Sequence, residues 1–295
     1  MRTKGGDVLM HPVRDEGSSH GDTKAAQTLD RAIDLLRHVA GSRETGASLS
    51  ELMRASGLTK PTTRRLLISL IENGLVEQRG EDRRYYVGAE TYALGMMASS
   101  RFGIDRVAVE SLRRLAKLSG DAALLTIQSG YHTVCVGREE GDFPLRSHVL
   151  QPGDRHPLGA GAAGLALLAA LPDEEIEKAL SVNAAVLSTN YANLHPTALK
   201  RDVTLTRERG YAVNPGLVVK GSWGVAVALR DPRSGVPAAL TIAGIESRFQ
   251  DGRLEQLVAM LQDEQGSLDA MLREDRGGNS HAAIATGKRP AAQSH

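Results

Sequence analysis

Basic side chains gather in one short segment, residues 59–73, whose apolar positions repeat at helical spacing. Lys60, Arg64 and Arg65 lie in its first two turns, and no acidic residue follows them until Glu72. Lysine and arginine contact phosphates, and arginine also pairs with the O6 and N7 atoms of guanine. The chain has 36 Lys and Arg against 35 Asp and Glu, a formal net charge of +1, so nucleic acid must bind a local patch of this kind.

A pair of short helices is predicted to hold this segment in place. Ser48 and Glu51 fit a capping box at the start of the first helix, where each side chain satisfies a free backbone N–H group. Gly57 ends that helix, and Thr59 and Pro61 begin the second helix almost at once. Two helices joined by so short a turn are typical of a helix-turn-helix.

The flanking segments favour a winged form of this motif. A helix is predicted over residues 28–40, and two short strands joined by a charged turn over residues 75–87. The second helix of the pair would enter the major groove, and Arg83 and Arg84 would reach phosphates or the minor groove. The alternative is an ordinary helical hairpin with a solvated basic face, although such faces usually alternate in sign. The predicted DNA-binding residues are Ser48, Thr59, Lys60, Pro61, Thr62, Thr63, Arg64, Arg65, Ser69, Arg83 and Arg84.

A glycine-rich turn, Gly159–Gly164, matches the pattern G-x-G-x-x-G. A dinucleotide site needs an apolar strand directly before this pattern, whereas residues 151–157 are polar and contain two prolines. We therefore reject a nicotinamide or flavin site here. The turn still offers free N–H groups and the positive end of a helix dipole, which favour a small anion. Gly159 and Gly161 would leave a ligand space beside the backbone.

Residues suited to catalysis or metal binding are sparse. The chain has no G-x-S-x-G, H-E-x-x-H or phosphate-loop motif. Its single cysteine, Cys135, excludes a disulfide framework and a cysteine-based zinc site. A metal site at His148 and His156 is an alternative, but we interpret both as loop or carboxylate-contacting histidines. We therefore predict no catalytic residue, no cofactor and no metal.

The rest of the chain mixes strand-like and helix-like segments without strict alternation. A helix over residues 89–101 bridges the two regions, and a turn at 231–235 makes the strands beside it an antiparallel pair. This predicts an α+β class, with helices packed on a mostly antiparallel sheet. The predicted strands are 123–127, 133–136, 146–150, 211–213, 224–229 and 238–243, and the predicted helices are 105–118, 161–170, 173–180, 197–209 and 250–273.

Both ends of the chain are polar and lack periodicity. Residues 1–25 and 274–295 are expected to be disordered tails. No stretch approaches the roughly 20 apolar residues of a membrane span, and no apolar signal segment is evident. We therefore expect a cytoplasmic protein without a membrane partner.

Seven short segments form a specific pattern when their order and spacing are taken together. They are QTLDRAIDLL (27–36), LSEL (49–52), GLTKPTTRRLL (57–67), RYYVG (84–88), LLAALP (167–172), RERGY (207–211) and VPAALTIAG (236–244). This pattern resembles that of IclR-type transcriptional regulators over residues 26–273. The resemblance implies a winged-helix DNA-binding domain (26–88), a linker helix used in dimerisation (89–104) and a GAF-like effector domain (105–273) that binds a small organic acid.

The same resemblance implies an effector pocket, and it shows where this chain departs from the family. The family often has a His and a Ser or Thr at Gly159 and Gly161, an Asp at Asn214, a Cys at Gly224 and a Ser at Ala243. The residues present here imply a larger and less polar pocket, which suits a bulkier, aromatic carboxylate. The implied pocket residues are Leu145, His148, His156, Gly159, Ala160, Gly161, Ala162, Asn214, Gly224, Thr241 and Ala243.

Trp223, the single tryptophan, is open to two interpretations. It stands at the head of an apolar strand, between Ser222 and Gly224. It is either a core anchor or an aromatic wall of the effector pocket, because neighbouring glycines open the backbone around it. We include it among the effector-binding residues on the second interpretation.

These observations predict a homo-oligomeric regulator, a dimer or a tetramer, that binds double-stranded operator DNA and responds to a small organic acid. An effector that binds two arrangements of the protein differently must shift DNA affinity reciprocally. One alternative is an enzyme that uses the Gly159–Gly164 turn as a cradle for a cofactor or substrate. Another is a DNA-binding module whose C-terminal domain only dimerises.

Overall fold

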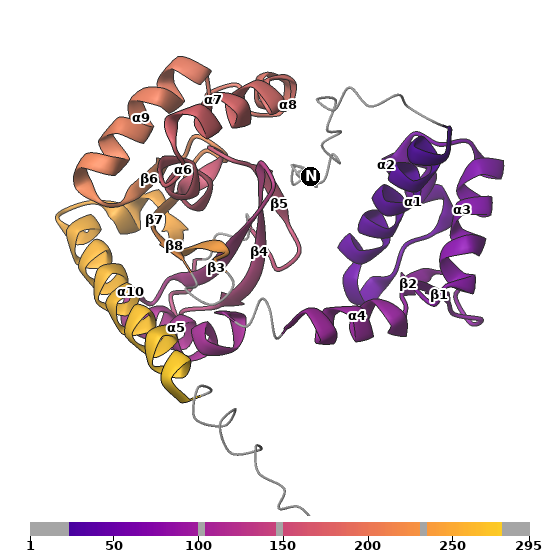
Figure 1. Ribbon diagram of the computed structural model, residues 1–295, viewed down its shortest axis with the longest axis horizontal. Helices are drawn as coiled ribbons and strands as arrows, with labels where there is room; N and C mark the ends of the chain where they lie inside the picture. Colours follow the sequence, from indigo (N-terminus) through magenta and orange to yellow (C-terminus); the bar gives the residue numbers. More distant parts are fainter. Residues whose placement is uncertain (1–23, 100–103, 146–149, 231–234, 279–295) are drawn as a thin grey trace, which may run out of the picture.

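The N-terminal part of the chain folds as a helical unit closed by a small hairpin (Figure 1). The computed structural model describes residues 24–99, 104–145, 150–230 and 235–278. The elements of this unit are α1 (Lys24–Gly41), the 3-10 turn η1 (Arg43–Thr45), α2 (Leu49–Ser56), α3 (Lys60–Glu72), β1 (Val76–Gln78) and β2 (Tyr85–Val87).

Local sequence signals explain where these helices begin and end. The Ser48 hydroxyl accepts the Glu51 N–H and the Glu51 carboxylate accepts the Ser48 N–H, which confirms the capping box. Gly57 ends α2 with φ 67°, a left-handed conformation that glycine adopts without strain. Leu52 of α2 and Leu67 of α3 are both 1% exposed and pack in one core. The winged helix-turn-helix is therefore confirmed.

Helix α4 (Ala89–Ser99) leads from this unit towards the C-terminal part. Its apolar side chains are unusually exposed, with Tyr92 at 72% and Met97 at 66%. Leu94 and Met96 are exposed beside them. Contiguous apolar side chains on a surface indicate an interface with another molecule. This helix occupies the position predicted for the linker, whose bounds remain a prediction.

The C-terminal part is built on one antiparallel sheet. Within the described residues the sheet has six strands in the order β5-β4-β3-β8-β7-β6, and each neighbouring pair is antiparallel. The predicted α+β class is therefore confirmed. The strands are β3 (Ala122–Ser129), β4 (His132–Glu139), β5 (Arg155–Pro157), β6 (Ala212–Pro215), β7 (Ser222–Arg230) and β8 (Pro237–Ile245).

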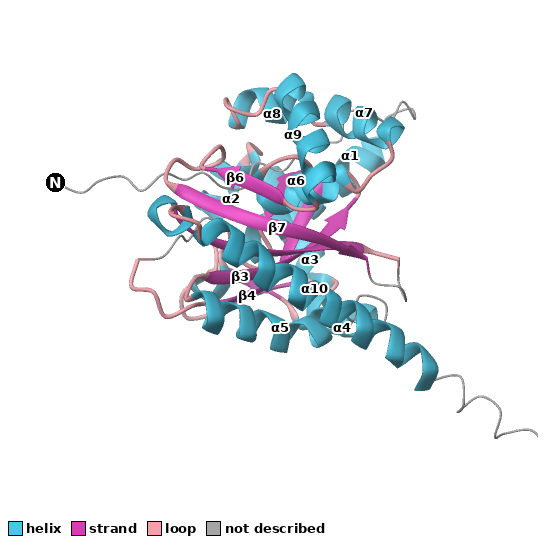
Figure 2. Ribbon diagram, turned by 90° about the vertical axis from the view of Figure 1, so that its left-hand side faces the viewer, coloured by secondary structure: helices cyan, strands magenta, loops and turns pink. Residues whose placement is uncertain are grey.

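Helices cover both faces of this sheet (Figures 1 and 2). Two helices pack on one face through a core that includes Leu115, Leu125 and Leu261. On the other face one helix packs directly, and three more lie outside it in the described part of the chain. The two helices on the first face are α5 (Ile104–Ser119) and α10 (Arg253–Gly278). The helix that packs directly on the other face is α6 (Gly161–Ala169), and the three outside it are α7 (Asp173–Val182), α8 (Ala184–Asn190) and α9 (Pro196–Arg209).

The clearest differences from the predicted elements are the edge strand β5, helix α8 and the start of α10. Residues 146–149 of the predicted strand lie outside the described residues, and the edge strand of this region is β5. Helix α8 was missed because seven residues are too few to show a helical period. A short 3-10 turn, η2 (Glu246–Phe249), precedes α10, which therefore begins at Arg253 rather than at 250.

The predicted tails fall mostly on residues 1–23 and 279–295, which lie outside the described residues. Residues 24–25 belong to α1 and residues 274–278 to α10, so these parts are helical. None of the helices described is both long and apolar enough to cross a membrane.

Candidate functional site

The exposed face of α3 carries the basic residues that the sequence singles out. Lys60, Arg64 and Arg65 are exposed, whereas Leu66 and Leu70 on the opposite face are buried. The three cations lie in the N-terminal half of the helix, where the helix dipole favours negative charge. Cations at this end therefore do not stabilise the helix, but they favour binding of an anion such as a phosphate.

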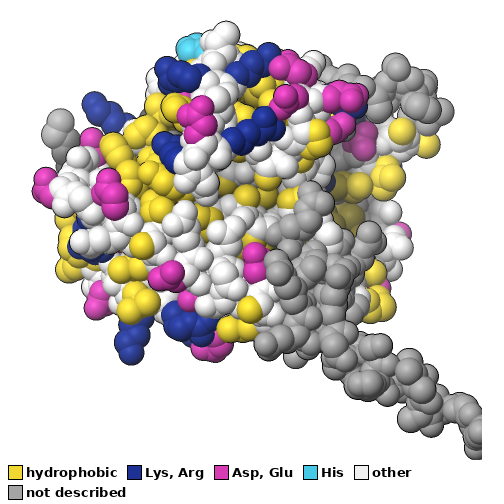
Figure 3. All heavy atoms as spheres, turned by 60° about the vertical axis from the view of Figure 1, so that its left-hand side comes forward, with side chains coloured by type: hydrophobic (Ala, Val, Ile, Leu, Met, Phe, Trp, Pro, Cys, Tyr) yellow, Lys and Arg dark blue, Asp and Glu magenta, His cyan; other side chains and the backbone are white. Residues whose placement is uncertain are grey.

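These cations are not neutralised by the protein. Among the described residues, Lys60, Arg64 and Arg65 form no ion pair. The face over α9 is different, because Lys and Arg side chains lie beside Asp and Glu there (Figure 3). One such pair joins Lys200 to Glu177 at 2.6 Å. The basic patch on α3 is thus a local feature, as the near-zero net charge requires.

Two residues of the predicted DNA-binding set support the fold. Thr63 is fully buried, and its hydroxyl donates to the Thr59 carbonyl at 3.0 Å, so its assignment as a DNA contact is wrong. The Ser48 hydroxyl is engaged in capping α2. The hydroxyls of Thr59 and Thr62 lie 3.0 Å apart at the start of α3 and remain candidates.

The two wing arginines differ in role. The Arg84 guanidinium donates to the carbonyls of Thr45 and Gly46 at 2.8 and 2.9 Å and pairs with Glu51 at 2.8 Å. Arg84 therefore ties the hairpin to η1 and α2, and its assignment as a DNA contact is corrected. Arg83 is exposed at the hairpin turn with φ 55°, and it remains the candidate phosphate contact of the wing.

One exposed residue of α3 was not predicted. Pro61, Arg64, Arg65 and Ile68 follow the spacing i, i+3, i+4 and i+7, so they form one stripe of the helix. Ile68 is 52% exposed at the C-terminal end of this stripe. Helical periodicity alone would have found it. Ser69, which was predicted, is exposed beside it.

The second candidate site lies where α6 begins, on the sheet face that α6 covers. Strand register places Gly224 and Ala243 opposite each other on this face, with Asn214 opposite Gly224 on the edge strand. A Cβ atom at Gly224 would lie 3.5 Å from Ala162 Cβ and 3.8 Å from Thr241 Cγ2. The structure thus brings together five of the predicted effector residues, which are Ala162, Asn214, Gly224, Thr241 and Ala243.

The N-terminus of α6 is buried and lacks a side-chain cap. Ala160 holds the cap position, where its methyl group cannot accept a hydrogen bond. Ala160 and Ala162 are 4% and 5% exposed. A Cβ atom at Gly161 would meet nothing within 4 Å, so open space adjoins the free N–H groups. A buried helix N-terminus beside open space is suited to an anion.

Two buried hydroxyls lie on the same sheet face. Thr241 and Thr126 are 6% and 1% exposed. Neither Oγ1 atom has a hydrogen-bond partner among the described residues. Buried hydroxyls are normally paired, so these two are available to a ligand. Thr126 was not predicted, because its strand is apolar on both faces and shows no alternation.

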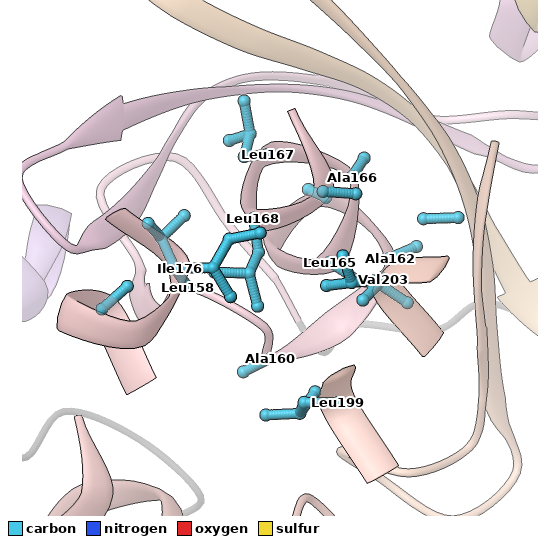
Figure 4. Close-up of a cluster of buried hydrophobic side chains, with 14 of the residues drawn as sticks. Leu158, Ala160, Ala162, Leu165, Ala166, Leu167, Leu168, Ile176, Leu199 and Val203 are labelled. Carbon is cyan, nitrogen blue, oxygen red and sulfur yellow. The ribbon is translucent and has the colours of Figure 1, made fainter. Parts of the chain in front are cut away.

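Gly159 has a different role from the one predicted. Its N–H donates to the Gly164 carbonyl at 3.0 Å. A Cβ atom at Gly159 would lie 3.1 Å from Leu199 and 3.3 Å from Leu168, in the core around α6 shown in Figure 4. The expectation that Gly159 leaves space for a ligand is therefore wrong. The same expectation for Gly161 agrees with the open space beside that residue.

His156 is buried on β5 and fixed by a tyrosine. Its Nδ1 lies 2.7 Å from the Tyr191 hydroxyl. Burial lowers the pKa of His156 to about 4 and raises the pKa of Tyr191 to about 12, so both are neutral at pH 7. His156 lies opposite Thr133, on the same sheet face as Thr126.

Two predicted effector residues do not join this group, and the position of a third is not described. Trp223 points to the other face of the sheet, where it packs with the core of α5 and α10 and its ring lies 6.1 Å from that of Phe249. Its assignment as a pocket wall is wrong. Leu145 is 63% exposed at the surface and does not join the buried group either. His148 lies outside the described residues.

A contact joins the two parts of the chain near this site. Arg43 of η1 lies 3.6 Å from Asp154, two residues before His156. Asp154 is buried, and this burial raises the pKa of its carboxyl group. The contact links the DNA-binding unit to the segment that leads into β5.

Neither a metal site nor a reactive thiol is apparent in the described part of the chain. Within it, no group of three or more His, Cys, Asp or Glu side chains is arranged to hold a metal ion. Cys135 is buried, and burial raises the pKa of its thiol to about 12. A protonated, buried thiol is a core residue.

Two family matches cover most of the chain. Residues 28–80 match the IclR helix-turn-helix domain, and residues 96–270 match the C-terminal domain of bacterial transcriptional regulators of the IclR type. The chain belongs to the IclR family. It is thus a transcriptional regulator with a DNA-binding helix-turn-helix domain and an effector domain, and not an enzyme.

Relatives of this IclR-family regulator cover about four fifths of the chain. The acetate operon repressor of Salmonella typhimurium is 30% identical over 241 residues, covering 81% of this chain and 87% of the relative. The repressor AllR of Escherichia coli is 30% identical over 247 residues, with 81% and 88% covered. A solved IclR homologue from Microbacterium hydrocarbonoxydans, complexed with 4-hydroxybenzoate, is 22% identical with a TM-score of 0.65, covering 84% of this chain and 99% of that one.

Proposed function

We propose that this regulator binds its operator through α3 and the wing, and that a small organic carboxylate bound at the start of α6 sets its operator affinity. One observation carries the effector part of the proposal. Ala162 at the uncapped, buried N-terminus of α6 and Thr241, whose hydroxyl has no hydrogen-bond partner among the described residues, both adjoin Gly224.

The charge and size of the site favour an anion with an apolar body. The N–H groups of α6 favour negative charge, and Asn214 and Thr241 add neutral hydrogen-bonding groups. Gly224 and Ala243 have small side chains or none, so they take up little of the sheet face, and open space adjoins Gly161 at the start of α6. The 4-hydroxybenzoate held by the Microbacterium relative makes aromatic acids the first compounds to test.

The DNA part rests on the exposed stripe of α3. Arg64 and Arg65 are free of ionic partners among the described residues, and they project from the helix that enters the major groove in this motif. Bidentate pairing with guanine is the commonest specific contact of arginine. Arg83 at the wing contacts a phosphate and adds affinity without sequence preference.

Coupling between the sites follows from linkage in an oligomer. The exposed apolar side chains of α4, such as Tyr92 and Met97, support self-association of this chain as a dimer or a tetramer. A carboxylate that binds one arrangement of the oligomer more tightly than the other shifts operator affinity by the same factor.

Calorimetric titration of the full-length protein with a panel of carboxylates tests the effector site. The panel contains pyruvate, succinate, benzoate and 4-hydroxybenzoate. We expect at least one to bind, and Thr241→Val to weaken its binding about 5- to 10-fold, the scale of one lost hydrogen bond.

Thr206→Val is the matched control. Thr206 is also buried, and its hydroxyl has no hydrogen-bond partner in the described part of the chain. It lies in α9, whose Arg207 donates to the Ala169 carbonyl at the opposite end of α6. The affinity of Thr206→Val for the carboxylate should stay within about twofold of that of the parent. Binding by no member of the panel, or equal binding by Thr241→Val and the parent, contradicts the proposal.

A further inference from the structure

We infer that Thr126 is a second polar anchor of the effector site, and that the effector carries hydrogen-bonding groups at both of its ends. This inference rests on the proposed function, because it takes the Thr241 end of the site to hold the carboxylate. The ligand class it names is an aromatic carboxylate with a hydroxyl group opposite the carboxylate.

The strand register fixes the relation between the two threonines. Thr241 on β8 lies opposite Leu124, and Thr126 on β3 lies opposite Ala239. The two threonines are therefore diagonal neighbours on adjacent antiparallel strands, with Cα atoms roughly 7–8 Å apart and side chains on one face. A benzoate ring with substituents at opposite ends spans a distance of this order.

Thr126 has no structural use for its hydroxyl. Thr133, on the same face of the next strand, shows the ordinary arrangement, because its hydroxyl donates to the His156 carbonyl at 3.2 Å. Thr126 is more deeply buried than an average threonine, at 1% exposure, and its Oγ1 has no partner among the described residues. A buried hydroxyl with no internal partner is suited to a ligand atom.

The two strand neighbours of Thr126 are neutral, so they favour a neutral group. Cys135 lies opposite Thr126 on β4, and its buried thiol is protonated. Ala239 lies opposite on β8. The carboxylate belongs at the other end, because Thr241 is a diagonal neighbour of Gly224 on the adjacent strand, and Gly224 adjoins Ala162 at the positive end of α6. A hydroxyl group therefore fits the Thr126 end better than a second carboxylate does.

The test is a comparison of 4-hydroxybenzoate with benzoate, which lacks the hydroxyl group. Calorimetric titrations use the full-length protein, Thr126→Val and Thr241→Val. We expect the parent to bind 4-hydroxybenzoate about 5- to 10-fold more tightly than benzoate. Thr126→Val should remove this preference and leave benzoate affinity within about twofold, whereas Thr241→Val should weaken both compounds by similar factors.

Thr126→Ser keeps the hydroxyl and should keep the preference, which guards against a packing effect of the valine. Loss of both ligands equally in Thr126→Val, with an unchanged melting temperature, overturns the inference while leaving the Thr241 site intact. So does an unchanged preference in Thr126→Val. If the parent binds neither compound, the ligand class is wrong, and the outcome with pyruvate and succinate decides the wider proposal separately.

Discussion

Replacing Arg84 by alanine should destabilise the DNA-binding unit and not act as the loss of a DNA contact. The guanidinium donates to the carbonyls of Thr45 and Gly46 and pairs with Glu51. Hydrogen bonds from a charged group contribute about 1.5–3 kcal/mol each when buried. The Arg84 side chain is 32% exposed and that of Glu51 is 50% exposed, so the ion pair adds little. The bond to Thr45 is exposed and the bond to Gly46 is only partly buried, so we expect a net loss of about 2 kcal/mol of unfolding free energy in this unit, less than two fully buried bonds would give.

Arg83→Ala is the matched control, because it removes the same charge from the residue directly before Arg84. A loss of 1 kcal/mol lowers the melting temperature of a unit this small by about 4–8 °C, so Arg84→Ala should lower it by about 10 °C. Arg83→Ala should leave the melting temperature within about 2 °C and reduce the slope of log affinity against log salt by about 1. Calorimetry and hydrogen exchange of β2 amides measure stability, and operator titrations measure the slope. Unchanged stability of Arg84→Ala together with a reduced salt slope would refute this division of roles.

Three further substitutions probe separate parts of the account. Arg65→Ala should cost about 1–3 kcal/mol of operator binding and relax specificity at one base pair per half-site, as measured by titration against single-base operator variants; equal binding by the parent and the variant would remove Arg65 from the interface. His156→Gln should remove a pH dependence of stability. The pKa of His156 is about 4 in the folded protein and about 6.5 in the unfolded chain, so the parent's free energy of unfolding falls by about 3 kcal/mol as pH drops from 6.5 to 4. Urea unfolding at both pH values checks this, and identical pH profiles of the parent and the variant would contradict it. Arg43→Ala should reduce the effect of the effector on operator affinity by about two- to fivefold, since Arg43, whose side chain is 47% exposed, pairs with the buried Asp154 and joins the two domains. An unchanged ratio of affinities with and without effector would show that this contact plays no part.

Local signals in the sequence were enough to predict the DNA-binding unit. The capping box at Ser48 and Glu51 and the turn at Gly57 depend only on neighbouring residues, and the structure contains all of them. The basic stripe of α3 follows from helical periodicity in the same way. Arg84 could not be assigned from the sequence, because its partners Thr45 and Gly46 lie 39 and 38 residues away along the chain.

The effector site was harder to predict because it depends on strand register. A shift of one residue moves a side chain to the other face of a sheet, and Trp223 therefore faces the core of α5 and α10 while Gly224 faces α6. Thr126 lies in a strand that is buried on both faces, so hydrophobic alternation gives no sign of its direction. The contact of Gly159 with Leu199 needs the packing of α9, which no local pattern contains.

The central claim is that a carboxylate at the start of α6 controls operator affinity. The most direct measurement is the operator affinity of the full-length protein and of Thr241→Val, each with and without the tightest-binding carboxylate of the panel, on an operator selected from random DNA. The account predicts that the carboxylate changes the parent's operator affinity by about fivefold or more. It also predicts that Thr241→Val binds ligand-free operator like the parent but loses most of this response at the same carboxylate concentration. A response of equal size in Thr241→Val, or a carboxylate that binds the parent without changing its operator affinity, would contradict the account.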